Sequence, residues 1–267
     1  MNKLTEWKST YEELMKLGSG AHGTVSVVKN LKDNDFYIVK RVKINNGTRI
    51  EPDGTPTEVA VMKRLQHIPG VCRILDWYQT SEVDKVREEY VITMPYLENV
   101  MDLFDFIKEN KQKNIGNKLV VFTNLVRIVR DMFEAGYVHN DLKPENVLVN
   151  PDTLEVTLID FDAADSADAQ ITDFVGTLDY NPPELFRTHR ADPESFTVWT
   201  LGLMFYEMLV HKQAFYGADE IKGSKTVYVK DKYCKNPVVQ NLVDKMLEKN
   251  PLHRYTLDRV WSELQRV

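Results

Sequence analysis

The feature that most constrains this chain is the run HNDLKPEN at residues 139–146. It contains Asp141, Lys143 and Asn146 in the spacing D-x-K-x-x-N, with apolar residues directly after it. Further along, Asp160 stands in an apolar segment of its own. Carboxylate and amide oxygens suit a hard divalent cation. The two segments therefore combine a possible base with possible metal ligands.

Size and composition allow one large domain or two lobes with a cleft between them. The chain has 267 residues, 43% of them hydrophobic and 28% charged, as in an ordinary globular protein. A net charge of −6 argues against non-specific nucleic-acid binding and is compatible with a basic partner. The longest apolar-rich stretch, residues 199–210, is too short to span a bilayer and includes Glu207.

Cysteine use and the N-terminus bear on the cellular location. Cys72 and Cys234 fit neither a disulfide framework nor a zinc spacing. The first residues show no signal pattern, and no internal repeat is visible. A reducing location, cytoplasmic or also nuclear, is therefore expected.

A glycine-rich segment near the N-terminus is the second informative motif. Its pattern, G-x-G-x-x-G, is weak alone because dinucleotide-binding folds share it. In those folds a helix follows the glycines, whereas residues 24–28 alternate with β-branched side chains and predict a strand. A strand, a glycine turn and a strand can bring backbone N–H groups close to phosphates. The residues of this flap are Leu17, Gly18, Ser19, Gly20, Ala21, His22, Gly23, Thr24 and Val25.

A lysine and an acid follow the flap. Residues 36–42 predict a strand that carries Lys40, and residues 55–65 predict a helix that carries Glu58. Two roles for Glu58 stay open. The spacing favours an ion pair with Lys40, but Glu58 also completes a capping box with Thr55.

Hydrophobic periodicity and β-branched content predict the remaining elements. Strands are expected at residues 73–78 and 89–94, and helices at residues 103–109, 116–136, 199–210, 238–248 and 256–266. The helix at residues 116–136 would present the loop that contains Asp141.

In this order and spacing, the segments resemble the eukaryotic protein kinases. Lysine within D-L-K-P-E-N is typical of the Ser/Thr kinases. Residues 46–50, 74–77 and 102–107, together with one extra residue in the segment 94–104, are similar to the Pim family of Ser/Thr kinases.

The resemblance implies an α+β fold with two lobes and an ATP cleft between them. A small β-rich N-lobe with one regulatory helix would take residues 1–94, and a hinge would take residues 95–101. A larger, mostly α-helical C-lobe would take residues 102–267, so that the whole chain is one protein kinase domain.

The resemblance also implies the cofactors, ATP and Mg²⁺, and the reacting groups. Asp141 would accept the proton of the substrate hydroxyl, and Lys143 would neutralise charge on the moving phosphoryl group. Asn146 and Asp160 would hold the magnesium ion.

The nucleotide would contact both lobes. Lys40 would hold the α- and β-phosphates and pair with Glu58. Ile38, in place of the family's alanine, would narrow the adenine pocket. Leu97 stands where Pim hinges carry proline, so its N–H stays available. Asp102 suits the ribose hydroxyls and equally a helix N-cap, and the two roles are compatible. The other expected contacts are Met94, Leu148 and Ile159.

Residues 176–184 resemble the segment that seats the residue after the target hydroxyl. Thr177 would bridge the catalytic acid and the lysine of the loop, with a phosphorylation site as the alternative. Glu184 would form a buried ion pair with Arg254.

Three acids bear on the choice of substrate. Glu145, beside the catalytic loop, and Asp102 and Asp105, below the hinge, would meet arginines upstream of the target residue. The alternative is that these three acids, in a chain with 40 acidic residues, have no role in substrate choice. The expected partners are protein substrates with basic residues near the target, with no nucleic acid, no membrane and a monomeric enzyme.

Three further departures from the family pattern matter for activity. Asn140 replaces the arginine that receives an activation-loop phosphate, so activity should not depend on phosphorylation at Thr172. Asp162 replaces a glycine that favours positive φ, and it would add a third carboxylate near magnesium. Thr197 replaces an anchoring aspartate that Pim kinases also lack.

Three functions follow in order of preference. A Ser/Thr protein kinase comes first. A nucleotide-binding pseudokinase that acts as a scaffold is second, because of Asp162 and Ile38. A small-molecule kinase is third, because Thr177 and residues 182–184 suit a protein substrate.

Overall fold

The structure is a computed structural model, and it describes residues 9–20, 23–79, 88–110, 115–223, 227, 229 and 236–267. Ala21, His22 and Cys234 lie outside the described residues. The chain divides into two compact units. One is Met1–His67 with Val71–Glu98, and the other is Ile68–Gly70 with Asn99–Val267.

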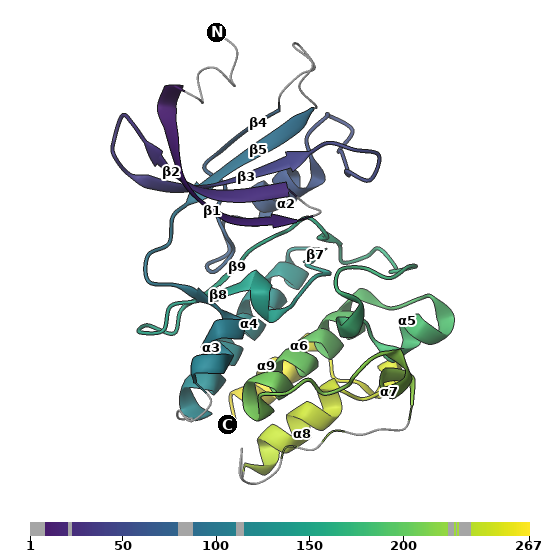
Figure 1. Cartoon of the computed structure of the whole chain (residues 1–267). Coiled ribbons are helices and arrows are strands. Elements are labelled where there is room, and N and C mark those ends of the chain that lie inside the picture. The colour runs from purple at the N-terminus through teal and green to yellow at the C-terminus, as the bar shows by residue number, and fades with distance from the viewer. Residues whose placement is uncertain are drawn as a thin grey trace. The chain divides into compact units, whose positions relative to one another are not determined.

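The smaller unit is built on one antiparallel sheet with the strand order β1-β2-β3-β5-β4 (Figure 1). Its elements are β1 (Tyr11–Gly20), β2 (Gly23–Asn30), β3 (Phe36–Lys43), α2 (Thr57–Leu65), β4 (Asp76–Gln79) and β5 (Glu89–Pro95). Val28, Val39, Tyr78 and Val91 form a buried cluster on the sheet. Side chains alternate between the faces of a strand, so these β-branched and aromatic residues bury one face together.

Strand β4 is shorter than the sequence predicts. It begins at Asp76 and not at residue 73, although Leu75 already donates its N–H to Thr93 O at 2.9 Å. The β-branched content of this segment does not reveal where its pairing with β5 starts, because pairing depends on the partner strand.

The larger unit is mostly helical. Its helices are α3 (Leu103–Glu109), α4 (Ile115–Glu134), α5 (Pro183–Thr188), α6 (Pro193–Val210), α7 (Ala218–Lys222), α8 (Pro237–Met246) and α9 (Leu257–Leu264). Single 3₁₀ turns occur at η1 (Pro144–Asn146), η2 (Leu178–Tyr180) and η3 (Pro251–His253). Its short strands are β6 (Met101–Asp102), β7 (Tyr137–Val138), β8 (Val147–Val149), β9 (Val156–Leu158) and β10 (Asp165–Ser166).

Helix α6 is buried on nearly all sides, as its apolar sequence predicts. It begins earlier than the apolar run suggests, because Asp192 caps it by accepting the Ser195 N–H and Pro193 suits its first turn. Phe205 stacks on Phe122 of α4, with ring centroids 4.0 Å apart. Among the described residues, no helix combines the length and the apolar character that crossing a bilayer requires.

Strands β8 and β9 bring the two acid-bearing segments together. They pair antiparallel, with Val147 opposite Leu158. Just beyond this pair, Ile159 donates its N–H to Asn146 O at 3.0 Å. The register therefore places Asn146 and Asp160 at the same end of one hairpin.

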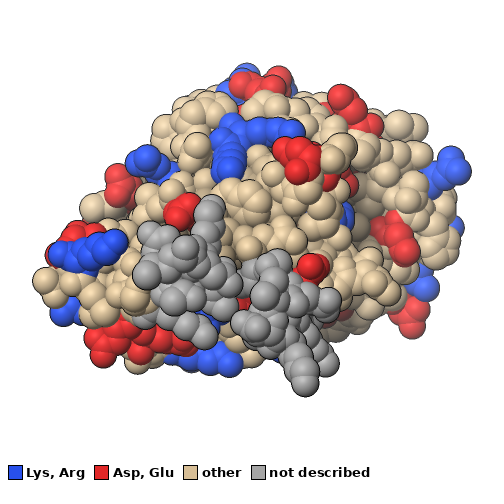
Figure 2. Space-filling view, turned by 90° about the horizontal axis from the view of Figure 1, so that it is seen from above, with Lys and Arg blue, Asp and Glu red and all other residues tan. Residues whose placement is uncertain are grey.

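Figure 2 shows charged side chains on one face of the molecule. On the face shown in Figure 2, acidic and basic side chains are interspersed.

Candidate active site

His139 joins the catalytic loop to the segment that carries Asp160. It is buried, and its Nε2 lies 3.0 Å from Ile159 O. A carbonyl oxygen only accepts, so Nε2 carries the hydrogen and Nδ1 is left to accept the Asp141 N–H at 3.3 Å. Burial lowers the pKa of His139, and the ring stays neutral near pH 7.

Both oxygens of the Asp141 carboxylate are engaged. Oδ2 accepts from Lys143 Nζ at 2.8 Å and from Asn146 Nδ2 at 3.1 Å. Oδ1 accepts the Thr177 N–H at 2.9 Å and lies 3.1 Å from the Thr177 hydroxyl. Lys143 Nζ also reaches that hydroxyl, at 3.2 Å. Thr177 thus bridges Asp141 and Lys143, as the resemblance implied.

Asn146 and Asp160 fit a magnesium site by their chemistry. The Asn146 amide nitrogen donates to Asp141 O at 2.8 Å, which fixes the amide so that its oxygen is the atom left for a ligand. No hydrogen bond to that oxygen is found in the part of the chain that the structure describes. Magnesium favours few protein oxygens and keeps several waters or phosphate oxygens, so one amide and one carboxylate suffice.

The structure corrects one expectation about Asp162. Positive φ occurs at Asp160, with φ 65°, and Asp162 is not among the positive-φ residues. The backbone at position 162 therefore does not require glycine. The expectation that Asp162 adds a third carboxylate near magnesium stays a prediction. Phe161, between the two acids, is fully buried against His139.

In the smaller unit, Lys40 and Glu58 form a buried ion pair with 2.5 Å between Nζ and Oε1. The Tyr90 hydroxyl donates to the other carboxylate oxygen at 3.0 Å. The rival capping-box role is wrong, because Pro56 is the N-cap of α2 and no side-chain cap bond forms. Glu58 points instead to the sheet.

Gly18 and Gly23 of the flap differ in whether the fold itself requires glycine. A Cβ on Gly23, at φ 119°, would lie 2.0 Å from Arg41 O, so strand β3 itself requires glycine there. A Cβ on Gly18 would meet nothing within 4 Å. The protein itself therefore sets no steric requirement for glycine at Gly18.

The other predicted nucleotide contacts are half-buried apolar side chains within their own units. In the smaller unit Ile38 pairs with Met94 across β3 and β5. In the larger unit Leu148 pairs with Asp102 across β8 and β6. The Asp102 carboxylate accepts the Asp105 N–H at 2.8 Å, so its capping role is confirmed. Thr24, Val25, Leu97 and Ile159 are partly exposed, and Leu17, Ser19 and Gly18 are exposed.

This geometry agrees with the comparison against known families. The protein kinase domain matches residues 11–264. The chain belongs to the protein kinase family. The Lys40–Glu58 pair of the smaller unit lies within the matched residues. The cluster of Asp141, Lys143 and Thr177 in the larger unit, here called the Asp141 cluster, lies within them too.

Individual relatives of this kinase share its fold and much of its length. It is 29% identical to the serine/threonine-protein kinase pim-2 of Danio rerio, over 91% of this chain and 80% of that protein. It is 31% identical to cyclin-dependent kinase 4 of Xenopus laevis, over 80% and 68%. The kinase PK-1 of the Cydia pomonella granulovirus has the same fold, with a TM-score of 0.79, 20% identity and coverage of 97% of this chain and 95% of that one.

Glu207 is a partly buried acid near the η2 turn to which sequence reasoning assigned no role. The Tyr180 hydroxyl lies 3.4 Å from Glu207 Oε2. Burial raises the pKa of Glu207, and the charge of Glu145 raises it further. Burial, then Glu207 and Glu145, likewise raises the pKa of Tyr180. The available signal was an acid inside the otherwise apolar run 199–210.

The Glu184–Arg254 ion pair of the kinase is present. Two contacts of 2.7 and 3.0 Å join the carboxylate to the guanidinium, whose side chain is 0% exposed. Arg254 also donates to Ser195 O at 2.7 Å and lies over the Trp199 ring. The pair ties α5 to the loop before α9.

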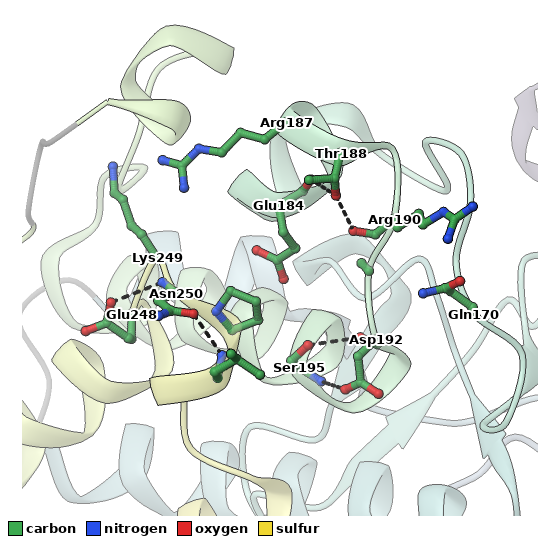
Figure 3. A pocket seen from close by; sticks show the side chains of 13 residues that line it. Gln170, Glu184, Arg187, Thr188, Arg190, Asp192, Ser195, Glu248, Lys249 and Asn250 are labelled. Atoms are coloured by element: carbon green, nitrogen blue, oxygen red, sulfur yellow. Dashed lines mark hydrogen bonds between the residues drawn. The ribbon is translucent and has the colours of Figure 1, made fainter.

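Glu184 also lines a surface pocket of about 890 Å³ (Figure 3). No residue of the Asp141 cluster lines this pocket. Its basic residues are Arg187, Arg190 and Lys249, and its acids are Glu184, Asp192 and Glu248. Each acid accepts a hydrogen bond within the protein.

Proposed function

We propose that this kinase transfers the γ-phosphoryl group of ATP, with Mg²⁺, to serine and threonine hydroxyls of proteins. The single observation that carries the proposal is the cluster of Asp141, Lys143 and Thr177. The cluster places the Asp141 carboxylate beside the Lys143 ammonium group, and the Thr177 hydroxyl contacts both. Asp141 is 15% and Lys143 24% exposed, so a substrate can reach both side chains.

The chemistry follows from these groups. The substrate oxygen forms a bond to the γ-phosphorus while the bond to the β-phosphate oxygen breaks and ADP leaves. Asp141 orients the hydroxyl and takes its proton, and Lys143 offsets the negative charge spread over the phosphoryl oxygens. Magnesium held by Asn146 and Asp160 would supply further charge neutralisation at the phosphates. Lys40, fixed by Glu58, would hold the α- and β-phosphates.

We propose a preference for basic sequence contexts. Glu145 is exposed, and Glu207 and Tyr180 lie near enough for its charge to act on both. Carboxylates in such a group attract a guanidinium, which binds them in bidentate fashion. Asp105 is exposed at the start of α3, where Asp102 caps the helix, and it would add charge of the same sign.

Activity without phosphorylation of the activation loop is the third part of the proposal. Asn140 carries no charge with which to bind a phosphate, and its amide nitrogen donates instead to Ala163 O at 3.2 Å. Thr172 is exposed and has no arginine at position 140 to meet.

A nucleotide-binding scaffold is the rival function, based on Asp162 and Ile38. The φ values weaken the part of that argument that rests on Asp162. The intact hydrogen bonding of Asp141 supports the enzyme.

The experiment is a peptide-phosphorylation assay with phosphatase-treated enzyme, Mg²⁺ and radiolabelled ATP. Two serine peptides differ only in whether arginines or glutamines precede the serine. We expect the arginine peptide to react at least about tenfold faster, a difference of about 1.4 kcal/mol. Equal rates would refute the basic preference, and activity only before phosphatase treatment would refute phosphate independence.

A variant pair locates the preference. Glu207→Gln should lower the discrimination between the two peptides without changing the KM for ATP. Glu134→Gln removes an exposed acid of α4 and should leave the discrimination unchanged.

A further inference from the structure

Asn181 has an unusual position for a polar side chain. It is 0% exposed and follows the η2 turn directly. Its Nδ2 lies 3.1 Å from Val175 O, 3.0 Å from Thr177 O and 3.3 Å from Leu178 O. Its Oδ1 lies 3.4 Å from the Val175 N–H. One amide group therefore contacts the backbone at both ends of the segment 175–178.

Side-chain packing holds only part of this segment, whose turn is also closed by backbone hydrogen bonds from Tyr180 N–H to Thr177 O and from Asn181 N–H to Leu178 O. The side chains of residues 172–174 and of Leu178 and Asp179 are exposed, and Val175 is only partly buried. Val175 packs against the cluster around Leu185, and the Phe174 ring contacts Phe186. These contacts hold one end of the segment and leave Gly176 and Thr177 to be positioned by hydrogen bonds.

The position of Thr177 depends on the same backbone. Its N–H and hydroxyl both lie within 3.1 Å of Asp141 Oδ1. Its carbonyl, on the other side of the residue, accepts from Asn181. A shift of this backbone would separate Thr177 from Asp141 and Lys143 together, because a single residue makes all of these contacts.

We infer that Asn181 is a positioning residue that holds residues 175–178 in the substrate-receiving conformation without a loop phosphate. The inference rests on the proposed kinase function. It names the side chain that would hold the substrate-receiving segment in position. Only a side chain with two donors and an acceptor on one short planar group can make this set of contacts. Aspartate has the same shape but lacks the donors, and alanine lacks all of the polar atoms.

The experiment compares Asn181→Ala and Asn181→Asp with wild type, using phosphatase-treated full chain. Misplacement of a reacting group by about 1 Å can cost on the order of 100-fold in rate. We expect kcat/KM for the peptide to fall by about 10- to 100-fold in both variants. The KM for ATP should stay near wild type. The melting temperature should fall in both variants, and more in Asn181→Asp, whose buried carboxylate faces carbonyl oxygens.

The pH profile separates positioning from a structural effect. A protonated carboxyl regains one donor, so the activity of Asn181→Asp relative to wild type should rise as the pH is lowered. The activity of Asn181→Ala relative to wild type should show no such rise.

The matched control is Asn150→Ala. The Asn150 side chain also orders a turn, by accepting the N–H groups of Asp152 and Thr153 between β8 and β9. This variant should keep the wild-type kcat/KM for the peptide.

The outcomes separate the two claims. If wild type transfers no phosphate, the proposed function fails. If wild type is active and both Asn181 variants keep its peptide kinetics, or lose ATP binding in parallel with peptide kinetics, the positioning role is overturned.

Discussion

At the scale of single residues, the site depends on how closely the backbone can approach Asp141. Gly176 has φ 57°, and a Cβ there would lie 2.5 Å from Asp141 Oδ1 and 2.6 Å from Asn140 O. A contact of this length forces one of the two segments to move. Glycine at this position is therefore part of the acceptor site, a role that the pattern G-T alone does not reveal.

Gly176→Ala should lower kcat/KM for a peptide by on the order of 100-fold, because the added methyl displaces Thr177 from Asp141. The measurement is steady-state kinetics with peptide and ATP varied in turn. Gly136→Ala is the control, since Gly136 has φ 87° but nothing within 4 Å of an added Cβ. Equal kinetics in Gly176→Ala and wild type would contradict the close approach.

His139 predicts a pH dependence of stability. Its folded-state pKa is lowered by burial, so below its unfolded pKa of about 6.5 the unfolded chain binds more protons than the folded chain. Stability from this group is full above about pH 6.5 and falls as the pH drops toward the lower folded pKa. The slope is at most about 1.4 kcal/mol per pH unit.

Urea unfolding at pH 7.5 and 5.5 measures this loss. His139→Gln removes the titrating group and should lose less stability between the two pH values than wild type. The same loss in both proteins would show that His139 does not carry it.

At the scale of elements, the helices of the larger unit are joined by specific polar contacts as well as by apolar packing. The bidentate Glu184–Arg254 pair links α5 to the loop that precedes α9, and Arg254 also holds Ser195 O of α6. Because the guanidinium is fully buried, removing the acid leaves a charge without its partner.

Glu184→Ala should lower the free energy of unfolding by roughly 3–5 kcal/mol. Chemical denaturation followed by circular dichroism measures this change. Asp258→Ala breaks an ion pair with Arg130 in which the acid is 77% exposed, and it should have little effect. If Glu184→Ala is as stable as Asp258→Ala, the buried pair does not hold the unit together.

At the scale of the whole molecule, local patterns predicted most elements and the residues of the catalytic loop. The D-x-K-x-x-N run identified Asp141, Lys143 and Asn146 because these residues are close in sequence. The Glu58 role could be chosen only once the sheet placed Lys40 and Tyr90 beside α2.

Long-range contacts account for what the sequence left open. Glu207 meets Tyr180 because α6 passes beneath the η2 turn, and no spacing rule relates these positions. The amide of Asn181 faces backbone carbonyls whose directions follow from the folded turn. The aspartate that replaces the family's glycine at position 162 had suggested a left-handed backbone there, but the left-handed residue is Asp160. The backbone conformation here is set by the hairpin and by the packing of Phe161.

The most direct test of the account is the transfer of labelled γ-phosphate to a serine peptide by wild type and by Asp141→Asn, with magnesium present. We predict transfer by wild type and a loss of about 100-fold or more in Asp141→Asn, with unchanged ATP affinity and melting temperature. No transfer by a folded, ATP-binding wild type, or equal rates in the two proteins, would contradict the central role of Asp141.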